Sequence, residues 1–248
     1  MISIVLLGTG GAIPTPTRAP SASWITLDDR SFLLDPGPGA LSRLVKPPHG
    51  PNSLDAVTAV LLTHLHPDHC ADLVPLLFAL RLRISTSEAP LQIIGPRGLA
   101  GYLAKLHELY GEWTEPRLRP VIVIELEPGD RLSPSSDTGG IWAVTSIDTD
   151  PSVICFSSAH FEDRFSAWNL GFRFTDLQGH TLVCSGDSGP CRAAEPASVV
   201  LTHLDPLIDR LDAAALVREQ WQGEVVAARD DDRFTVPPSA VKDPSCDR

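Results

Sequence analysis

The sequence predicts an α/β sandwich, and three observations lead to this fold class. Short apolar runs typical of buried strands alternate with segments whose apolar residues recur at three- and four-residue spacing. Strand-rich blocks occur in each half of the chain, which favours a sandwich over an all-β barrel. The chain has 248 residues, 43% of them hydrophobic, with no linker long enough to divide it, so we expect one large core.

The first half of the chain begins with strands and continues with alternating helices. Residues 2–7 form a β-branched run that ends at the turn Gly8-Thr9-Gly10-Gly11, and Asp28-Asp29 joins the two strands of a hairpin. The glycine-rich turn lacks the Lys-Ser/Thr of a phosphate-binding loop, which argues against a nucleotide site. The remaining strands are expected at 22–27, 30–34, 56–62 and 91–94, and the helices at 40–46, 71–82 and 99–109.

The second half of the chain is expected to consist mainly of strands. A polar turn is expected at 133–140 and a helix at 213–221. From Pro237-Pro238 onward the sequence is typical of a mobile tail, so the predicted domain spans residues 1–236 and the tail 237–248. The expected strands cover residues 121–126, 142–147, 153–157, 170–175, 181–184, 199–202, 225–228 and 234–236.

Charge and cysteine content restrict the environment and the partners. The formal net charge is −11, which disfavours a long polyanion as the default partner unless arginines cluster locally. The five cysteines are odd in number and show no CxxC spacing, which argues against a disulfide framework and fits a reducing cytoplasm. No apolar stretch approaches the roughly 20 residues of a membrane span, so no membrane partner is expected.

The segment His64-Leu65-His66-Pro67-Asp68-His69 directly follows an expected strand and concentrates four groups that can bind a transition metal. Imidazole and carboxylate are the ligands that borderline ions such as Zn²⁺ take, and a strand end holds them at fixed separation. At this composition, such a string arises by chance on the order of once in a thousand sequences. The segment therefore predicts a metal site.

Three further residues share this position just beyond an apolar strand: His160, Asp187 and His203. Ligands at several strand ends can converge on one edge of a sheet. A catalytic zinc ion normally takes three protein ligands and keeps one position for water. Together with the first segment, seven ligands exceed the need of one ion and suit two ions about 3.5 to 4 Å apart.

At these motifs the sequence resembles the metallo-β-lactamase-fold hydrolases, in the branch that contains ribonuclease Z and its phosphodiesterase relatives. The resemblance implies a four-layer αββα sandwich with the metal site at one edge of the two sheets, and a homodimer formed through the apolar helix at 71–82. The motifs that carry it are Leu7-Gly8-Thr9-Gly10, Leu34-Asp35-Pro36-Gly37, Thr63 to His69, Ser185-Gly186-Asp187-Ser188-Gly189 and Leu201-Thr202-His203-Leu204.

The resemblance also implies a division of the ligands between two ions. His64, His66 and His160 would hold one ion, Asp68, His69 and His203 would hold the other, and Asp187 would bridge them. Asp68 could in addition act in catalysis, by holding the attacking hydroxide or receiving its proton. Asp35 is a candidate for a carboxylate that supports the imidazoles, although an Asp before Pro-Gly is equally typical of a turn.

Two departures from the ribonuclease Z pattern affect the expected substrate. Only fifteen residues separate Asp187 from His203, and the segment 91–126 offers no long basic arm for tRNA. The leading hypothesis is therefore a dinuclear zinc hydrolase that attacks a phosphodiester or similar small anionic ester through a metal-bridging hydroxide. Mn²⁺ or Fe²⁺ could replace Zn²⁺. The alternatives are a ribonuclease Z-type tRNA 3′ endonuclease, a lactone or thioester hydrolase, and a catalytically weak metal-binding scaffold.

Overall fold

The computed structural model describes residues 1–46, 51, 54–82, 89–135, 141–158, 169–187, 198–206, 212–218, 221 and 223–236. The larger sheet has seven strands in the order β14-β1-β2-β3-β4-β5-β6. Strands β3, β4, β5 and β6 are mutually parallel, whereas β14, β1, β2 and β3 pair antiparallel. Its strands are β1 (Ile2–Gly8), β2 (Ala22–Leu27), β3 (Arg30–Leu34), β4 (Ala59–Leu61), β5 (Leu91–Pro96), β6 (Val121–Leu126) and β14 (Arg233–Val236).

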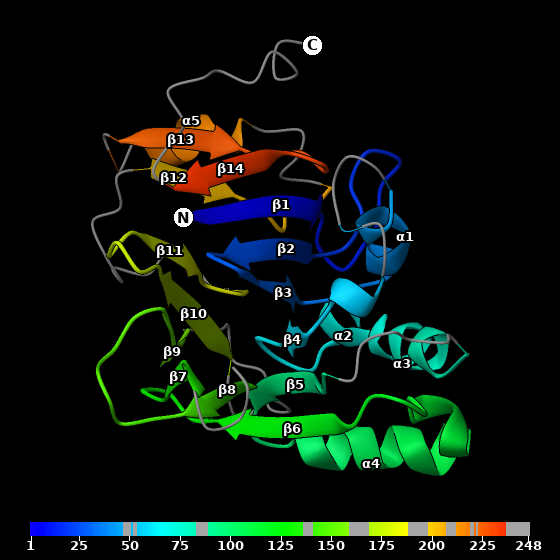
Figure 1. The fold of residues 1–248 in the computed structure, drawn as a ribbon. Helices are drawn as coiled ribbons and strands as arrows, with labels where there is room; N and C mark the ends of the chain where they lie inside the picture. Colours follow the sequence, from blue (N-terminus) through cyan, green and yellow to red (C-terminus); the bar gives the residue numbers. More distant parts are fainter. Residues whose placement is uncertain are drawn as a thin grey trace.

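A second, antiparallel sheet has five strands in the order β11-β10-β9-β7-β8, and a parallel pair β12-β13 forms a third. Figure 1 shows the five-stranded sheet against one face of the larger sheet. These strands are β7 (Arg131–Ser135), β8 (Ile141–Val144), β9 (Ser152–Ser157), β10 (Leu170–Thr175), β11 (Thr181–Cys184), β12 (Ser198–Leu201) and β13 (Glu224–Ala227).

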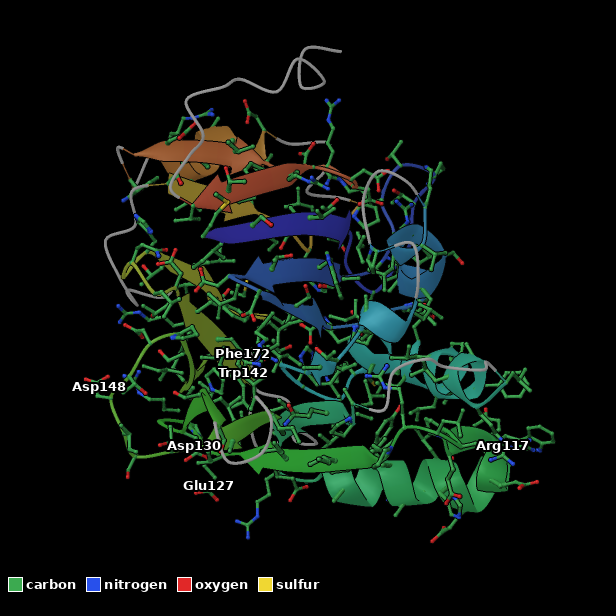
Figure 2. All side chains as sticks on the ribbon, in the orientation of Figure 1. Arg117, Glu127, Asp130, Trp142, Asp148 and Phe172 are labelled. Carbon is green, nitrogen blue, oxygen red and sulfur yellow. The ribbon has the colours of Figure 1, made fainter. Side chains whose placement is uncertain are left out.

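The main core lies between the two large sheets. Alternate residues of β1, namely Ile2, Ile4 and Leu6, face this core, because successive side chains of a strand point to opposite faces. From the opposite sheet, Trp142 and Phe172 fill the same space, and Figure 2 shows both between the sheets. The labelled charged side chains, such as those of Asp148 and Arg117, lie at the outside of the molecule (Figure 2).

Helices cover the other face of the seven-stranded sheet. A second apolar cluster combines Val5 and Leu7 of β1 with Leu73 and Leu76 of a helix. Figure 1 shows these helices on the side opposite the five-stranded sheet, which gives a layered α/β sandwich. The helices are α1 (Ala40–Leu44), α2 (Pro67–Cys70), α3 (Leu73–Leu82), α4 (Leu99–Tyr110) and, beside β13, α5 (Ala213–Arg218), with 3-10 turns η1 (Leu54–Ala56) and η2 (Gly111–Thr114).

Most expected elements occur in the structure, with two instructive differences. The strand expected at 56–62 shortens to β4, because a 3-10 turn ends at Ala56 and pairing with β3 begins only at Ala59. The turn expected at 133–140 begins later, because Ser133 and Pro134 pair with β8 and extend β7 to Ser135. Residues 136–140 and the predicted tail 237–248 lie outside the described residues.

The apolar face of α3 is part of the core. Leu73, Leu76, Leu77 and Leu80 are buried beneath the sheet, so their spacing is explained without a second chain. The homodimer expected from this helix stays a prediction.

Cys70, Cys155 and Cys184 are free thiols. In the part of the chain that the structure describes, no helix is long and apolar enough to cross a membrane.

Candidate metal centre

The parallel strands β3 and β4 deliver the first site residues to one edge of the sheet. Leu34 is in register with Leu61, so the residues that follow the two strands emerge side by side. The Asp35 amide donates to the Leu61 carbonyl at 2.9 Å and extends this pairing by one step. The chain after β4 then turns through Thr63 to the histidine-rich segment, which lies next to Asp35.

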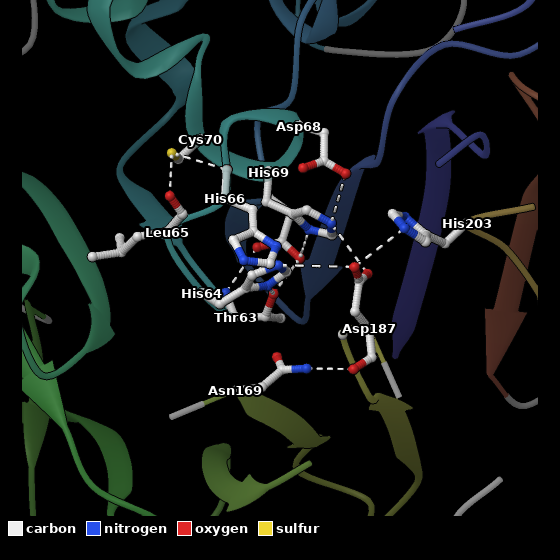
Figure 3. Close-up of polar contacts among 12 residues, drawn as sticks. Thr63, His64, Leu65, His66, Asp68, His69, Cys70, Asn169, Asp187 and His203 are labelled. Atoms are coloured by element: carbon white, nitrogen blue, oxygen red, sulfur yellow. Dashed lines mark hydrogen bonds and ion pairs between the residues drawn. The ribbon is translucent and has the colours of Figure 1, made fainter. Parts of the chain in front are cut away.

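The short helix α2 orients the second part of that segment. Pro67 occupies the first helical turn, where its missing N–H costs no hydrogen bond, and His66 lies at the N-cap. The backbone N–H groups of His69 and Cys70 both donate to the His66 carbonyl, at 3.0 and 3.2 Å. This tight turn directs His66, Asp68 and His69 toward one centre (Figure 3).

Six of the seven predicted ligands come together in two groups that share one carboxylate. The groups are His64, His66 and Asp187, and Asp68, His69, Asp187 and His203. Within each group the potential ligand atoms lie within 4.8 Å of one another. Figure 3 shows Asp187 between the histidines of the first segment and His203. The seventh residue, His160, lies outside the described residues.

The distances around Asp187 match a shared carboxylate. Its Oδ1 lies 3.1 Å from His69 Nε2, and its Oδ2 lies 3.2 Å from His203 Nε2 and 3.8 Å from His64 Nε2. Asp68 Oδ2 lies 3.5 Å from His69 Nε2. Two oxygens of one carboxylate therefore face imidazoles of both groups, which is the arrangement that a carboxylate between two cations requires.

The hydrogen bonding of the cluster supports its fit to a metal. His69 Nε2 and Asp187 Oδ1 are buried, and among the described residues neither has a hydrogen-bond partner of acceptable geometry, although they lie 3.1 Å apart. Buried polar atoms without such a partner cost roughly 1 to 3 kcal/mol each. Imidazole nitrogen and carboxylate oxygen are the atoms that Zn²⁺ takes as ligands. The residues present therefore fit divalent metal ions.

Asp35 supports the histidines from behind. Its Oδ1 accepts the Thr63 N–H at 2.8 Å, and its Oδ2 accepts the Thr63 hydroxyl at 2.8 Å and lies 3.1 Å from His69 Nδ1. The Thr63 hydroxyl is also 2.9 Å from His64 Nδ1. One buried carboxylate thus orients His69 directly and His64 through Thr63, as partners behind metal-binding histidines commonly do.

The charges of the cluster shift its pKa values in opposite directions. Burial and the neighbouring His69 imidazole lower the pKa of His64 to about 4. Burial also lowers the pKa of His69, but the carboxylates of Asp35 and Asp187 outweigh this and raise it to about 10. Burial raises the pKa of Asp187, but His203 and His69 outweigh it and hold that pKa well below its usual range. The carboxylates of Asp35 and Asp187 therefore favour positive charge at His69, whereas burial disfavours it at His64.

Backbone conformation at two candidate ligands, Asp187 and His203, is set by local contacts. Gly186, directly before Asp187, has φ +63°, and a Cβ there would lie 2.9 Å from the Thr63 Cβ and the Asn169 Oδ1. The Asn169 amide donates to the Asp187 carbonyl. His203 itself has φ +56°, a conformation that non-glycine residues rarely adopt. Both candidate ligands are thus held in turns that their neighbours determine.

Sequence reasoning did not identify Thr63 or Asn169 as contributors to the site. Asn169 comes just before β10 and has no motif around it that indicates a role, whereas Thr63 lies inside a recognised motif but carries no metal-binding group. Two other histidines lie in different surroundings. His107 is half-exposed and 3.4 Å from Glu115, and His180 is 3.0 Å from Asp176.

Comparison with known proteins agrees with this geometry. A family model described as the beta-lactamase superfamily domain matches residues 30–228. The metallo-β-lactamase fold protein YhfI from Bacillus subtilis superimposes with a TM-score of 0.69 at 19% identity, over 95% of this chain and 100% of that chain. The sandwich and its edge site therefore define a metal-dependent hydrolase with the metallo-β-lactamase fold.

Relatives in sequence identify the branch. A ribonuclease Z from Mycolicibacterium paratuberculosis is 30% identical over 221 residues, which cover 89% of this chain and 75% of the relative. A ribonuclease Z from Mycobacterium marinum is 33% identical over 192 residues, which cover 77% of this chain and 64% of that relative's length. The chain belongs to the beta-lactamase superfamily, in its ribonuclease Z and phosphodiesterase-like branch.

Proposed function

We propose that this hydrolase is a ribonuclease Z-type endonuclease that cuts a phosphodiester bond in the 3′ part of precursor tRNA. The observation that carries the proposal is the 30% identity to a ribonuclease Z over 89% of the chain. The two groups of ligand atoms that share Asp187 support the same chemistry, because two-metal sites act on phosphodiesters. The relatives' names favour this substrate over the small anionic ester that the sequence suggested.

The metal ligands follow from the two groups. His64 and His66, with His160 as the predicted third histidine, would hold one divalent ion. Asp68, His69 and His203 would hold the other, and Asp187 belongs to both groups. When bound, the ions supply a nucleophile at neutral pH by lowering the pKa of water, and they neutralise charge on the phosphoryl oxygens. Zn²⁺ is the preferred ion because imidazoles dominate the ligand set, and Mn²⁺ or Fe²⁺ are alternatives.

The chain's own carboxylates supply proton transfer and orientation. The Asp68 side chain is 13% exposed, more open to solvent than the buried His69 beside it. It can therefore accept the proton of the attacking water while its neighbour remains a ligand. Asp35 keeps His69 and His64 in register through the contacts described above, so that neither ring has to reorient during the reaction.

A small phosphodiester remains the second candidate substrate, on one specific observation. The formal net charge of −11 opposes a long polyanion at distances within a Debye length, about 10 Å at 0.1 M salt. Cleavage of precursor tRNA requires that the surface around the site attract RNA in spite of this negative net charge. Substrate preference is therefore the property that experiment has to decide.

The test compares the two substrates on zinc-loaded protein. We expect cleavage of a 3′-extended precursor tRNA at a single position that releases the 3′ trailer. His66→Ala should lower the rate at least a hundredfold, while the matched variant His107→Ala, which removes a half-exposed histidine outside the site, should match the wild type. Intact precursor tRNA together with rapid turnover of a bis-aryl phosphate would assign the small substrate instead. No turnover of either would favour a metal-binding scaffold.

A further inference from the structure

A polar network behind His203 is built around Asp230, a residue 27 positions further along the chain. The Asp230 side chain is only 7% exposed. Its Oδ1 accepts the Thr9 N–H at 2.8 Å and the Thr9 hydroxyl at 2.6 Å, and its Oδ2 accepts the Ala19 N–H at 2.7 Å. Arg43 adds an ion pair at 3.0 Å. One carboxylate thus binds both ends of the loop that joins β1 to β2.

The Thr9 end of that loop is in turn joined to the residue after His203. The Leu204 N–H donates to the Thr9 carbonyl at 2.9 Å, and the Gly11 N–H donates to the Leu204 carbonyl at 3.4 Å. Gly10 forms bridges with both Pro20 and Leu204. The segment Thr9 to Gly11 therefore acts as a short extra strand beside Leu204, and its position depends on the bonds that Thr9 makes with Asp230.

The turn that contains Asp230 is also attached to the strand that precedes His203. The Ala228 N–H, two residues before Asp230, donates to the Leu201 carbonyl at the end of β12 at 3.0 Å. Arg18 is buried and donates to the Ala228 carbonyl and, at 2.7 Å, to the Thr9 hydroxyl. The chain on both sides of His203 is therefore linked to one set of buried polar groups.

His203 needs such support because its own backbone is unfavourable. Its φ of +56° costs of order 1 to 3 kcal/mol for a residue with a Cβ, and it persists only where the surroundings impose it. The Gly11 backbone packs against the ring, since a Cβ at Gly11 would lie 3.5 Å from His203 Nε2. That Nε2 is the atom 3.2 Å from Asp187.

We propose that Asp230 is a positioning residue for His203, which it holds against Asp187 through Thr9 and Leu204. The inference rests on the metal centre of the proposed function but not on its substrate. We therefore expect that loss of the Asp230 contacts lowers the affinity for the ion held by Asp68, His69 and His203. The affinity for the ion held by His64 and His66 should be retained, because those residues follow β4 and are not part of the network around Asp230 described here.

Two kinds of variant test the inference. Asp230→Asn replaces one acceptor oxygen by an amide NH2 group, which cannot accept a hydrogen bond from the backbone N–H that it faces. It therefore disrupts at least one of the three hydrogen bonds that Asp230 accepts from Thr9 and Ala19. In case this variant does not fold, Thr9→Val removes only the hydroxyl, and Thr9→Ser retains it. Asp176→Asn is the matched control, because Asp176 is a buried carboxylate that also accepts two backbone N–H groups, at the β10–β11 turn.

The readout is the affinity of each ion, measured by competition with a chromophoric chelator and by the absorption spectrum of the cobalt-substituted protein. We expect Asp230→Asn and Thr9→Val to lower the affinity for one of the two ions at least tenfold, and to change only the part of the cobalt spectrum that belongs to that ion. Thr9→Ser and Asp176→Asn should retain both affinities. Unchanged affinities in Asp230→Asn and Thr9→Val, or equal weakening of both ions, would overturn the inference. Failure to cleave precursor tRNA with both ions bound would overturn only the substrate.

Discussion

Asp35→Asn tests how the site holds its histidines. The substitution preserves shape and the acceptor for the Thr63 N–H, but the second carboxylate oxygen becomes an amide nitrogen. That oxygen now accepts the Thr63 hydroxyl at 2.8 Å and lies 3.1 Å from His69 Nδ1. An amide nitrogen carries no negative charge and cannot act as an acceptor, so His69 loses the carboxylate oxygen beside Nδ1 that favours Nε2 as the metal-facing nitrogen.

The magnitude follows from the contact that is lost. Loss of a carboxylate partner behind a metal-binding histidine typically costs roughly tenfold to a hundredfold in metal affinity. Both oxygens of Asp35 belong to a residue that is 3% exposed, so solvent does not replace the carboxylate. We expect the affinity for the ion at His69 to fall by this factor. His64, which contacts the network only through Thr63, should be affected less.

The assay is chelator competition at neutral pH, with thermal unfolding of metal-free protein as a check on the fold. Asp72→Asn is the control, because Asp72 accepts the N–H groups of Gly39 and Leu41 at 3.2 and 2.9 Å and contacts no imidazole in these bonds. It should lower stability by about 1 kcal/mol and leave metal affinity unchanged. Wild-type affinity for both ions in Asp35→Asn would refute the reasoning.

Three further predictions concern stability and metal dependence. Gly186→Ala should lower the free energy of unfolding by about 1 to 3 kcal/mol more than Gly179→Ala in urea titrations, because both glycines have positive φ but only the first would place a Cβ against Thr63 and Asn169; equal losses would contradict this. Asp176→Asn should destabilise the protein by about 1 to 3 kcal/mol at pH 7. Burial raises the pKa of Asp176, but the amino terminus and His180 outweigh it and hold that pKa below the ordinary 3.8, so the stabilisation exists above pH 3.8 and is lost on further acidification; a wild-type-to-variant difference that stays constant down to pH 2 would be inconsistent. Removal of metal by a chelator should abolish hydrolysis and lower the melting temperature, and Zn²⁺ should restore both; full activity after verified metal removal would contradict metal dependence.

The sequence was informative wherever a residue's role depends on its place relative to a strand. Asp187 and His203 were predicted as ligands because each follows an apolar strand, and the structure brings both next to His69. The strands themselves were recognisable because their two faces enter two separate cores, which produces continuous apolar runs such as Ile4 to Leu7.

The supporting residues could not be predicted in the same way. The bond between Thr9 and Asp230 joins positions 221 residues apart, and nothing in the local sequence of either indicates it. The contact of Asn169 with Asp187 depends on how the loop before β10 meets the loop after β11. Such contacts follow from the packing of finished elements, so no spacing along the chain reveals them.

The number of ions bound per chain, measured by native mass spectrometry, tests the central claim of two metal groups that share Asp187. We expect two zinc ions in the wild type and one each in His66→Ala and His203→Ala, since each histidine belongs to one group alone. Asp187→Ala should lower the affinity for both ions, because the Asp187 carboxylate that it removes belongs to both groups. A wild type that holds fewer than two ions, or two ions retained in His203→Ala with unchanged affinity, would contradict it.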